Sequence, residues 1–273
     1  MKKDKMIMEK KFVLVTGAFG GMGEKVVCQL VKSGYSVIAL DKTVKESREN
    51  VYPIQVDITD EKSVLSALEK AKEITDSLYA IVHFAGIYML DSMVEISAEK
   101  FERILKCNFY GAFLINKTFL PLLSKGSKIL ITTSELAPLD PLPFTGLYAV
   151  TKSALDKYAY SLRMELQLLD ISVSVLRAGA VDTGMIGASV SALDAFCEKT
   201  KLYSCNAERF KRIVNGVEAR RILPKKIADK TVKILEKRKP KFAYSINRNP
   251  LLLVLNALPK RIQLWVIAKI LAP

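Results

Sequence analysis

The sequence predicts an α/β fold, a doubly wound parallel sheet in a single domain with a C-terminal helical extension. Short apolar runs of strand length alternate with stretches of helical length, which is typical of βαβ units. Runs such as VLV at 13–15 and SVIAL at 36–40 are almost continuously apolar, as expected for strands that helices cover on both faces. The 273 residues suffice for one such domain. We expect strands at 12–16, 36–40, 53–56, 79–84, 128–133 and 171–176.

The pattern loosens after the sixth strand. Residues 183–223 form a connection of a length that is usually functional, and it begins where ligands bind in doubly wound folds. We interpret 183–223 as a substrate lid. A helix at 224–238 and a short strand at 241–245 follow, so the dinucleotide-binding and catalytic domain is expected to span 10–245. Several apolar residues of the lid suit an apolar substrate or, equally, packing against the core: Met185, Ile186, Val190, Leu193, Phe196 and Leu202.

Residues 246–273 form a basic amphipathic extension. Residues 220–273 hold 14 Lys and Arg against Asp229 and Glu236, so most of the net charge of +14 lies near this end. The apolar stretches 251–258 and 262–271 are each too short to span a bilayer. We expect two short amphipathic helices that lie on a bilayer surface, or that cover the substrate pocket or a partner subunit. Apolar runs, not stacking aromatics, accompany the charge, which favours membrane surface and argues against nucleic acid.

The cysteines and the single histidine show no metal-ligand spacing. Without a CxxC pair, the sequence predicts no metal site and no disulfide framework, hence reduced thiols. The first ten residues are charged and lack the apolar region of a signal peptide. We therefore expect a cytoplasmic protein and leave membrane association open. The cysteines are Cys28, Cys107, Cys197 and Cys205.

A glycine-rich string, TGAFGGMG at 16–23, follows the first strand and precedes a helix. Glycines permit a tight turn and a close approach to a pyrophosphate at a helix N-terminus. Asp41 ends the second strand, where a carboxylate accepts both hydroxyls of an adenosine ribose but repels a 2′-phosphate. These features predict a Rossmann-like dinucleotide site that prefers NAD(H). The neighbouring Lys42 leaves NADP(H) open.

Tyr148 and Lys152 are one helical turn apart, and Ser134 ends the fifth strand. Reduction of a ketone by hydride requires a proton donor, and the reverse reaction requires a base. Tyr148 performs either role only if its pKa falls from about 10 toward neutrality, a shift that the ammonium of Lys152 would favour. Ser134 would hold the reacting oxygen. His83 ends the fourth strand, so we interpret it as structural and exclude a Ser-His triad.

The order of TGAFGGMG, HFAG at 83–86, Asn108, Ser134 and YAVTK at 148–152 resembles that of classical short-chain dehydrogenases/reductases, over about residues 10–245. The resemblance implies that Asn108 holds a water that links Lys152 to solvent. It also implies a set of cofactor-binding residues: Gly17, Phe19, Gly21, Met22, Gly23, Asp41, Asp57, Ile58, Ala85, Gly86, Tyr148, Lys152, Val181 and Thr183.

Two positions depart from the family pattern. Phe84 stands where the family usually has Asn, and Ala178 stands where it usually has Pro. Neither change removes the catalytic groups, but both lie where they affect cofactor affinity.

The segments ILPKKIAD, KRKPKFAYSI and LLLVLNALPKR are similar to the carboxyl ends of retinol and hydroxysteroid dehydrogenases. This resemblance implies a dehydrogenase of an apolar secondary alcohol or ketone, such as a steroid, bile acid or retinoid, and we expect a homo-oligomer. Two alternatives stay open. One is a reductase of a 3-oxoacyl group or another lipid ketone. The other is a non-catalytic dinucleotide-binding regulator, against which the complete set of Ser134, Asn108, Tyr148 and Lys152 argues.

Overall fold

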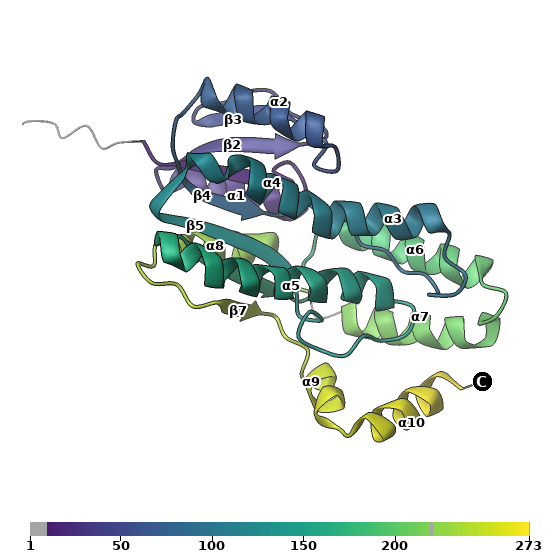
Figure 1. Ribbon diagram of the computed structural model, residues 1–273. Helices are drawn as coiled ribbons and strands as arrows, with labels where there is room; N and C mark the ends of the chain where they lie inside the picture. The colour runs from purple at the N-terminus through teal and green to yellow at the C-terminus, as the bar shows by residue number, and fades with distance from the viewer. Residues whose placement is uncertain (1–9, 219–220, 273) are drawn as a thin grey trace, which may run out of the picture.

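The computed structural model describes residues 10–218 and 221–272, and for 184–191 and 215–218 it describes the backbone alone. A seven-stranded parallel sheet, in the order β3-β2-β1-β4-β5-β6-β7, lies between two layers of helices (Figure 1). The predicted doubly wound, Rossmann-like sheet is confirmed. The strands are β1 Phe12–Thr16, β2 Ser36–Asp41, β3 Val51–Gln55, β4 Leu78–His83, β5 Leu123–Ser134, β6 Ser172–Ala178 and β7 Ala243–Ile246.

The predicted strands differ from the observed ones mainly at their ends. The largest difference is in β5, which begins five residues before the predicted 128, because its first residues are largely exposed and carry no apolar pattern. The strand β3 begins at Val51 and contains Pro53, which is tolerated because β3 lies at the edge of the sheet.

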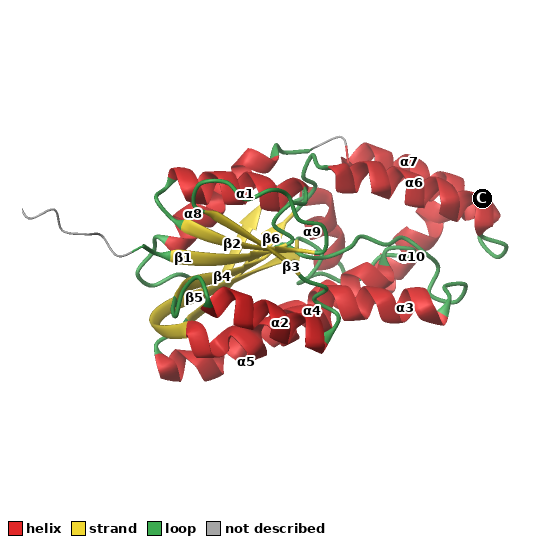
Figure 2. Cartoon of the chain, turned by 90° about the horizontal axis from the view of Figure 1, so that it is seen from above, coloured by secondary structure: helices red, strands yellow, loops and turns green. Residues whose placement is uncertain are grey.

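Helices cover both faces of the sheet, as Figure 2 shows. One cluster of buried side chains joins the sheet to α1 and α8, and a second joins its other face to α2, α4 and α5. Continuous apolarity of the central strands follows from this double coverage. The helices are α1 Gly21–Lys32, α2 Glu61–Lys72, α4 Gly111–Phe119, α5 Gly146–Leu166 and α8 Pro224–Leu235.

Three further helices, α3 Ala98–Leu105, α6 Gly184–Lys199 and α7 Ser204–Glu218, lie beyond the carboxyl ends of the strands (Figure 1). The proposed lid 183–223 thus consists largely of α6 and α7. Of the apolar lid residues singled out above, Leu193 and Phe196 are buried in a third hydrophobic cluster, whereas Leu202 is exposed. The side chains of Met185, Ile186 and Val190 lie outside the described residues.

The C-terminal extension forms two short helices, α9 Pro250–Ala257 and α10 Lys260–Leu271, below the main body in Figure 1. Leu258 and Pro259 separate them in extended backbone. Within residues 10–218 and 221–272, no helix combines the length and the apolarity that crossing a bilayer requires.

Candidate active site

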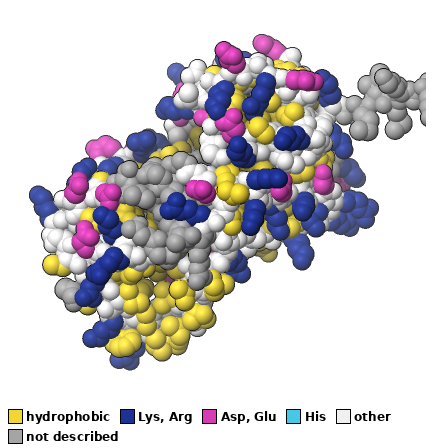
Figure 3. All heavy atoms as spheres, turned by 180° about the vertical axis from the view of Figure 1, so that it is seen from behind, with side chains coloured by type: hydrophobic (Ala, Val, Ile, Leu, Met, Phe, Trp, Pro, Cys, Tyr) yellow, Lys and Arg dark blue, Asp and Glu magenta, His cyan; other side chains and the backbone are white. Residues whose placement is uncertain are grey.

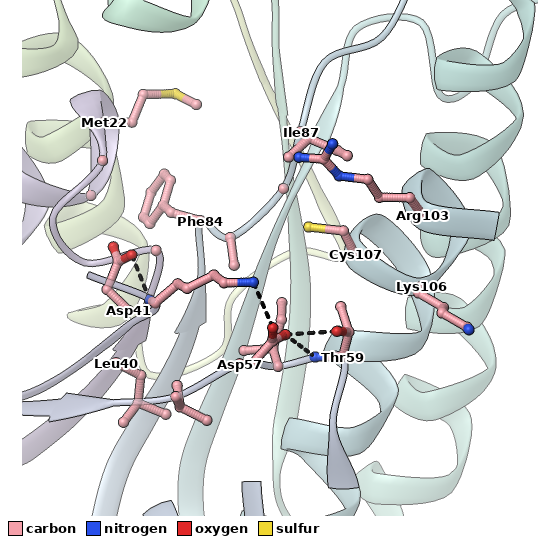
Figure 4. A pocket seen from close by; sticks show the side chains of 18 of the residues that line it. Met22, Leu40, Asp41, Asp57, Thr59, Phe84, Ile87, Arg103, Lys106 and Cys107 are labelled. Atoms are coloured by element: carbon pink, nitrogen blue, oxygen red, sulfur yellow. Dashed lines mark hydrogen bonds and ion pairs between the residues drawn. The ribbon is translucent and has the colours of Figure 1, made fainter. Parts of the chain in front are cut away.

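A cavity of about 590 Å³ opens at the carboxyl ends of β1, β2 and β4 (Figure 4). Its walls come from the glycine-rich loop, the ends of these strands, and α3 with the π-helical turn η1 Lys106–Tyr110. Ten of the residues that the sequence assigned to the cofactor line it: Gly17, Gly21, Met22, Gly23, Asp41, Asp57, Ile58, Ala85, Gly86 and Thr183.

The glycine-rich loop allows close approach of backbone segments. Gly17 has φ +66°, and a Cβ there would lie 2.6 Å from the Ala85 nitrogen. A Cβ on Gly21 would lie 2.6 Å from the Thr183 Cβ. Helix α1 starts at Gly21 with no side-chain cap on its first N–H groups. Its N-terminus therefore offers backbone donors and a positive dipole end to a phosphate, which fits a dinucleotide.

Asp41 is oriented by backbone donors at the end of β2. Its two carboxylate oxygens accept hydrogen bonds from the Phe19 N–H at 2.9 Å and the Lys42 N–H at 2.7 Å. Oδ1 also accepts from the Thr43 N–H at 3.4 Å, whereas Oδ2 accepts only from Phe19 and keeps a lone pair for a ribose hydroxyl. Phe19 is not among the residues that line the cavity, so its contribution is to position Asp41.

Lys42 and Asp57 form an ion pair across one end of the cavity, with Nζ 2.7 Å from Oδ2. The hydrogen bond from Lys42, together with those from Thr59, lowers the pKa of Asp57 to about 2. Dashed lines in Figure 4 mark these contacts on Asp57. Lys42, which the sequence left as a partner for a 2′-phosphate, is thus engaged by a carboxylate.

The opposite wall contains residues that the sequence analysis missed. Arg103 and Lys106, with Glu99 and Glu102, line the cavity from α3 and η1, and Cys107 lies beside them. They belong to no motif, but their helical spacing of three and four residues would have placed them on one face.

A second cavity, of about 240 Å³, adjoins the first, because Met22 and Thr183 line both. Ser134 and Tyr148 face it, and so does Val181, which the sequence assigned to the cofactor. Its remaining walls are mainly apolar and come from the loop after β5, from α7 and from α9: Leu136, Leu142, Phe210, Ile213, Val214 and Leu252.

Tyr148 and Lys152 lie on α5 as expected. The Lys152 Nζ is 5.8 Å from the centre of the Tyr148 ring and donates to the Thr132 carbonyl at 3.3 Å. Burial lowers the pKa of Lys152 to about 8. Burial also raises the pKa of Tyr148 above its usual value, and the hydrogen bond with Ser134 opposes this only in part. In the chain without a cofactor, desolvation therefore moves the pKa of Tyr148 in the direction opposite to the one that its expected role requires.

Asn108 lies within η1, buried behind the cavity wall. Its amide donates to the Ile87 carbonyl at 2.9 Å and to the Thr151 hydroxyl at 3.1 Å, and its Oδ1 accepts from the Ile87 N–H at 2.7 Å. A Cβ on Gly86 would lie 3.2 Å from the Asn108 Oδ1 and 3.5 Å from the Lys152 Nζ. The structure thus brings Asn108 and Lys152 together beneath Gly86.

The two departures from the family pattern are accommodated. Phe84 lines the cofactor cavity, and its N–H donates to the Thr16 carbonyl at 3.0 Å, so backbone bonding links β1 and the end of β4 without the amide side chain. At the other position, Ala178 and Gly179 line the second cavity. His83 is structural, since its ring bonds Asn116 at 2.9 Å and burial lowers its pKa to about 4.

Comparisons with known proteins agree with this geometry. The chain is 32% identical over 197 residues to estradiol 17-beta-dehydrogenase 2 of Mus musculus, covering 68% of this chain and 52% of that protein. It therefore spans about half the length of this relative. It is 25% identical over 255 residues to 3-ketodihydrosphingosine reductase of Bacteroides thetaiotaomicron, covering 93% of each.

A crystal structure of a short chain dehydrogenase from Burkholderia cenocepacia in complex with NADP has the same fold, with a TM-score of 0.73 at 20% identity, over 97% of this chain and 99% of that one. The sequence model of the short chain dehydrogenase family matches residues 11–194, more than half of the chain. This match includes the glycine-rich loop, Ser134, Tyr148 and Lys152, and the chain therefore belongs to the short-chain dehydrogenase family.

Proposed function

We propose that this protein is an oxidoreductase that transfers a hydride between a nicotinamide dinucleotide and an apolar secondary alcohol or ketone, such as a steroid, bile acid or retinoid. The observation that carries the proposal is that Ser134 and Tyr148 face one cavity with mainly apolar walls. That cavity shares Met22 and Thr183 with the larger one, which has the helix N-terminus and the carboxylate that a dinucleotide requires. A hydride donor and a carbonyl group would therefore meet beside a proton donor.

The bound nicotinamide would supply or accept the hydride. Tyr148 gives its hydroxyl proton to the reacting oxygen during reduction and receives a proton during oxidation. Ser134 orients that oxygen by a hydrogen bond. A tyrosine is protonated at neutral pH, and burial raises the pKa of Tyr148 further, so the chain by itself favours the role of acid. Lys152, with a pKa near 8, is mostly charged there. Asn108 supports the Ile87 backbone beside Lys152 and, by family resemblance, holds the water that leads to solvent.

NAD(H) is the proposed cofactor. Asp41 is held by three backbone N–H groups, and its Oδ2 keeps a lone pair for a ribose hydroxyl, whereas a 2′-phosphate would bring like charge to it. The pairing of Lys42 with Asp57 supports the same preference, since the nearest ammonium is already neutralised. NADP(H) is the alternative, and it requires Lys42 to leave Asp57 for the phosphate.

A second candidate substrate class is a 3-oxoacyl group or another lipid ketone. The specific observation in its favour is that the similarity to a 3-ketodihydrosphingosine reductase extends over 93% of both chains. The apolar walls of the catalytic cavity suit either class. The non-catalytic alternative is less favoured, because the Ser134 and Tyr148 side chains that turnover requires face the same cavity.

The test uses two substrate panels. The first contains steroids, bile acids and retinoids, and the second contains 3-oxoacyl thioesters and long-chain ketones. Ketones are tested with NADH and NADPH, and alcohols are tested with the oxidised cofactors. Turnover is followed by the absorbance of the reduced nicotinamide. We expect activity on the first panel. Activity confined to the second panel would select the lipid-ketone alternative, and tight dinucleotide binding without turnover on either panel would favour a regulator.

A further inference from the structure

The helices α9 and α10 carry an outward apolar surface. We define the tail surface as the exposed side chains Leu251, Val254, Ile262, Leu264, Trp265 and Ile270, whose exposed fractions run from 45% to 69%. Figure 3 shows hydrophobic side chains gathered at the lower end of the molecule, where α9 and α10 lie, with Lys and Arg at the edges. A soluble monomer rarely exposes contiguous apolar area on this scale without a partner.

The tail surface is held in place by specific contacts with the body. The Asn249 N–H donates to Glu135 at 2.6 Å, and the Asp140 N–H donates to the Asn256 side chain at 2.8 Å. Lys260 pairs with Asp140, and the Asn206 side chain donates to the Leu271 carbonyl at 2.6 Å. These contacts anchor both ends of the helical pair to the body of the protein.

The same helices border the catalytic cavity. Leu252 of α9 lines the cavity that contains Ser134 and Tyr148, and its neighbour Leu251 belongs to the tail surface. Across the cavity, Ile213 of α7 lines the wall and is 40% exposed. Helix α9 therefore contributes apolar side chains both to the tail surface and to the wall of the cavity that contains Ser134 and Tyr148.

Charge selects the kind of partner. Residues 246–273 contain Arg248, Lys260, Arg261 and Lys269 and no Asp or Glu. Arg261 and Lys269 are exposed beside the apolar residues of α10. A second copy seated face to face would bring like charges together, because a two-fold interface places the same patch on both sides. An anionic lipid surface offers both the apolar boundary and the opposite charge.

We propose that the tail surface docks on an anionic lipid bilayer, and that apolar substrate passes between the bilayer and the catalytic cavity along α9. The docking rests only on the surface itself. The passage of substrate rests on the proposed function, and the two are tested separately.

Trp265 is the only tryptophan of the chain and lies in the tail surface, 62% exposed, so the protein carries its own reporter. With vesicles of phosphatidylcholine and phosphatidylserine at low salt, we expect its emission to shift to the blue and the protein to sediment with the vesicles. Phosphatidylcholine alone and high salt should both weaken binding. Leu264→Glu should lower the partition coefficient between vesicles and water at least about tenfold. It replaces an apolar side chain that would be buried in the bilayer by a negative charge that the anionic lipid repels.

Leu168→Glu is the matched control, because Leu168 is 82% exposed after the far end of α5. It should bind vesicles like the native protein, and so should Tyr148→Phe. An unshifted Trp265 emission with the protein left in the supernatant would overturn the docking. The docking would also be overturned if the protein does not bind vesicles and instead forms a dimer that the Leu264→Glu substitution dissociates.

The passage of substrate is tested with an active apolar substrate presented in anionic vesicles and, separately, in detergent micelles. Leu264→Glu should lose about tenfold or more in rate with vesicles and keep its rate with micelles, since docking and not chemistry is impaired. Equal losses in both would overturn the passage. Vesicle binding by a protein that turns over no substrate would overturn the proposed function and leave the docking intact.

Discussion

The two adjoining cavities of this protein are built by different means. The cofactor cavity is formed by short stretches at the ends of neighbouring parallel strands, and its polar groups are backbone N–H donors and paired charges such as Asp41 and the Lys42–Asp57 pair. The catalytic cavity is closed by helices far apart in the sequence, α5, α7 and α9, and most of its walls are apolar side chains. The first therefore depends on backbone geometry and the second on packing.

The difference has a consequence for mutation. A change in the cofactor cavity acts through a few close backbone contacts, so its effects should be sharp and local. A change of the apolar walls should be tolerated, since volume-conserving exchanges between apolar side chains usually cost little. Tyr148, the proposed proton donor, is the exception in the catalytic cavity, because the proposed chemistry depends on its single hydroxyl.

The largest effect should come from Tyr148→Phe. Removal of the hydroxyl should lower kcat by about 100- to 10,000-fold, the usual contribution of a general acid, while the dissociation constant of the dinucleotide changes little. Steady-state rates and fluorescence titration of the reduced cofactor measure the two quantities. Tyr160→Phe, on an exposed part of the same helix, is the control. A variant with most of its activity would remove Tyr148 from the role of proton donor.

The second-largest effect should come from Gly21→Ala, in the wall that the two cavities share. Its Cβ would lie 2.6 Å from the Thr183 Cβ, so the wall shared by both cavities must move. We expect the dissociation constant of the dinucleotide to rise about 10- to 100-fold, equivalent to the cost of overpacking. The neighbouring Gly20→Ala is the comparison: Gly20 also lines the cofactor cavity, but the closest contact of its Cβ would be 3.4 Å, so we expect a smaller rise. Equal affinities for the two variants would contradict a wall set by close packing at Gly21.

The buried His83, at the end of β4, should make the free energy of unfolding depend on pH. Its pKa is about 4 in the folded protein against an ordinary 6.5, so the unfolded chain binds more protons between these values. The free energy of unfolding should therefore fall by about 2 kcal/mol between pH 7 and pH 5. Urea unfolding at both values measures it, and His83→Asn should remove most of the difference. The same slope in the variant would assign the pH dependence to other groups.

The smallest effect concerns the choice of cofactor. The native protein should use NADH over NADPH by at least roughly tenfold in kcat/KM, because Asp41 accepts from the ribose and repels a phosphate. Asp41→Ala should erase most of this preference. Lys42→Ala tests its neighbour, and we expect it to leave use of NADH unchanged. If the native protein uses NADPH equally well or better, we would infer that Lys42 leaves Asp57 and pairs with the 2′-phosphate, so that Lys42 and not Asp41 determines the choice of cofactor.

Much of this protein follows from local sequence. The parallel sheet follows from continuous apolar runs, since helices cover its strands on both faces. The glycine-rich string predicts which end of the sheet the proposed cofactor occupies, because backbone segments can approach this closely only where no Cβ intervenes. Ser134, Tyr148 and Lys152 are recognisable by their spacing on one strand end and one helix face. Each of these features depends on residues that are near one another in the chain.

Other features depend on what packs around a residue, and only the tertiary structure decided them. The pKa of Tyr148 rises because the folded chain removes the hydroxyl from water, an effect that outweighs the neighbours visible in the sequence. Arg103 and Lys106 reach the cofactor cavity because α3 and η1 pack beside it. The position of Leu252 in the catalytic wall depends on α9 being tied to Glu135, 114 residues away in sequence from Asn249, and no local pattern encodes that contact.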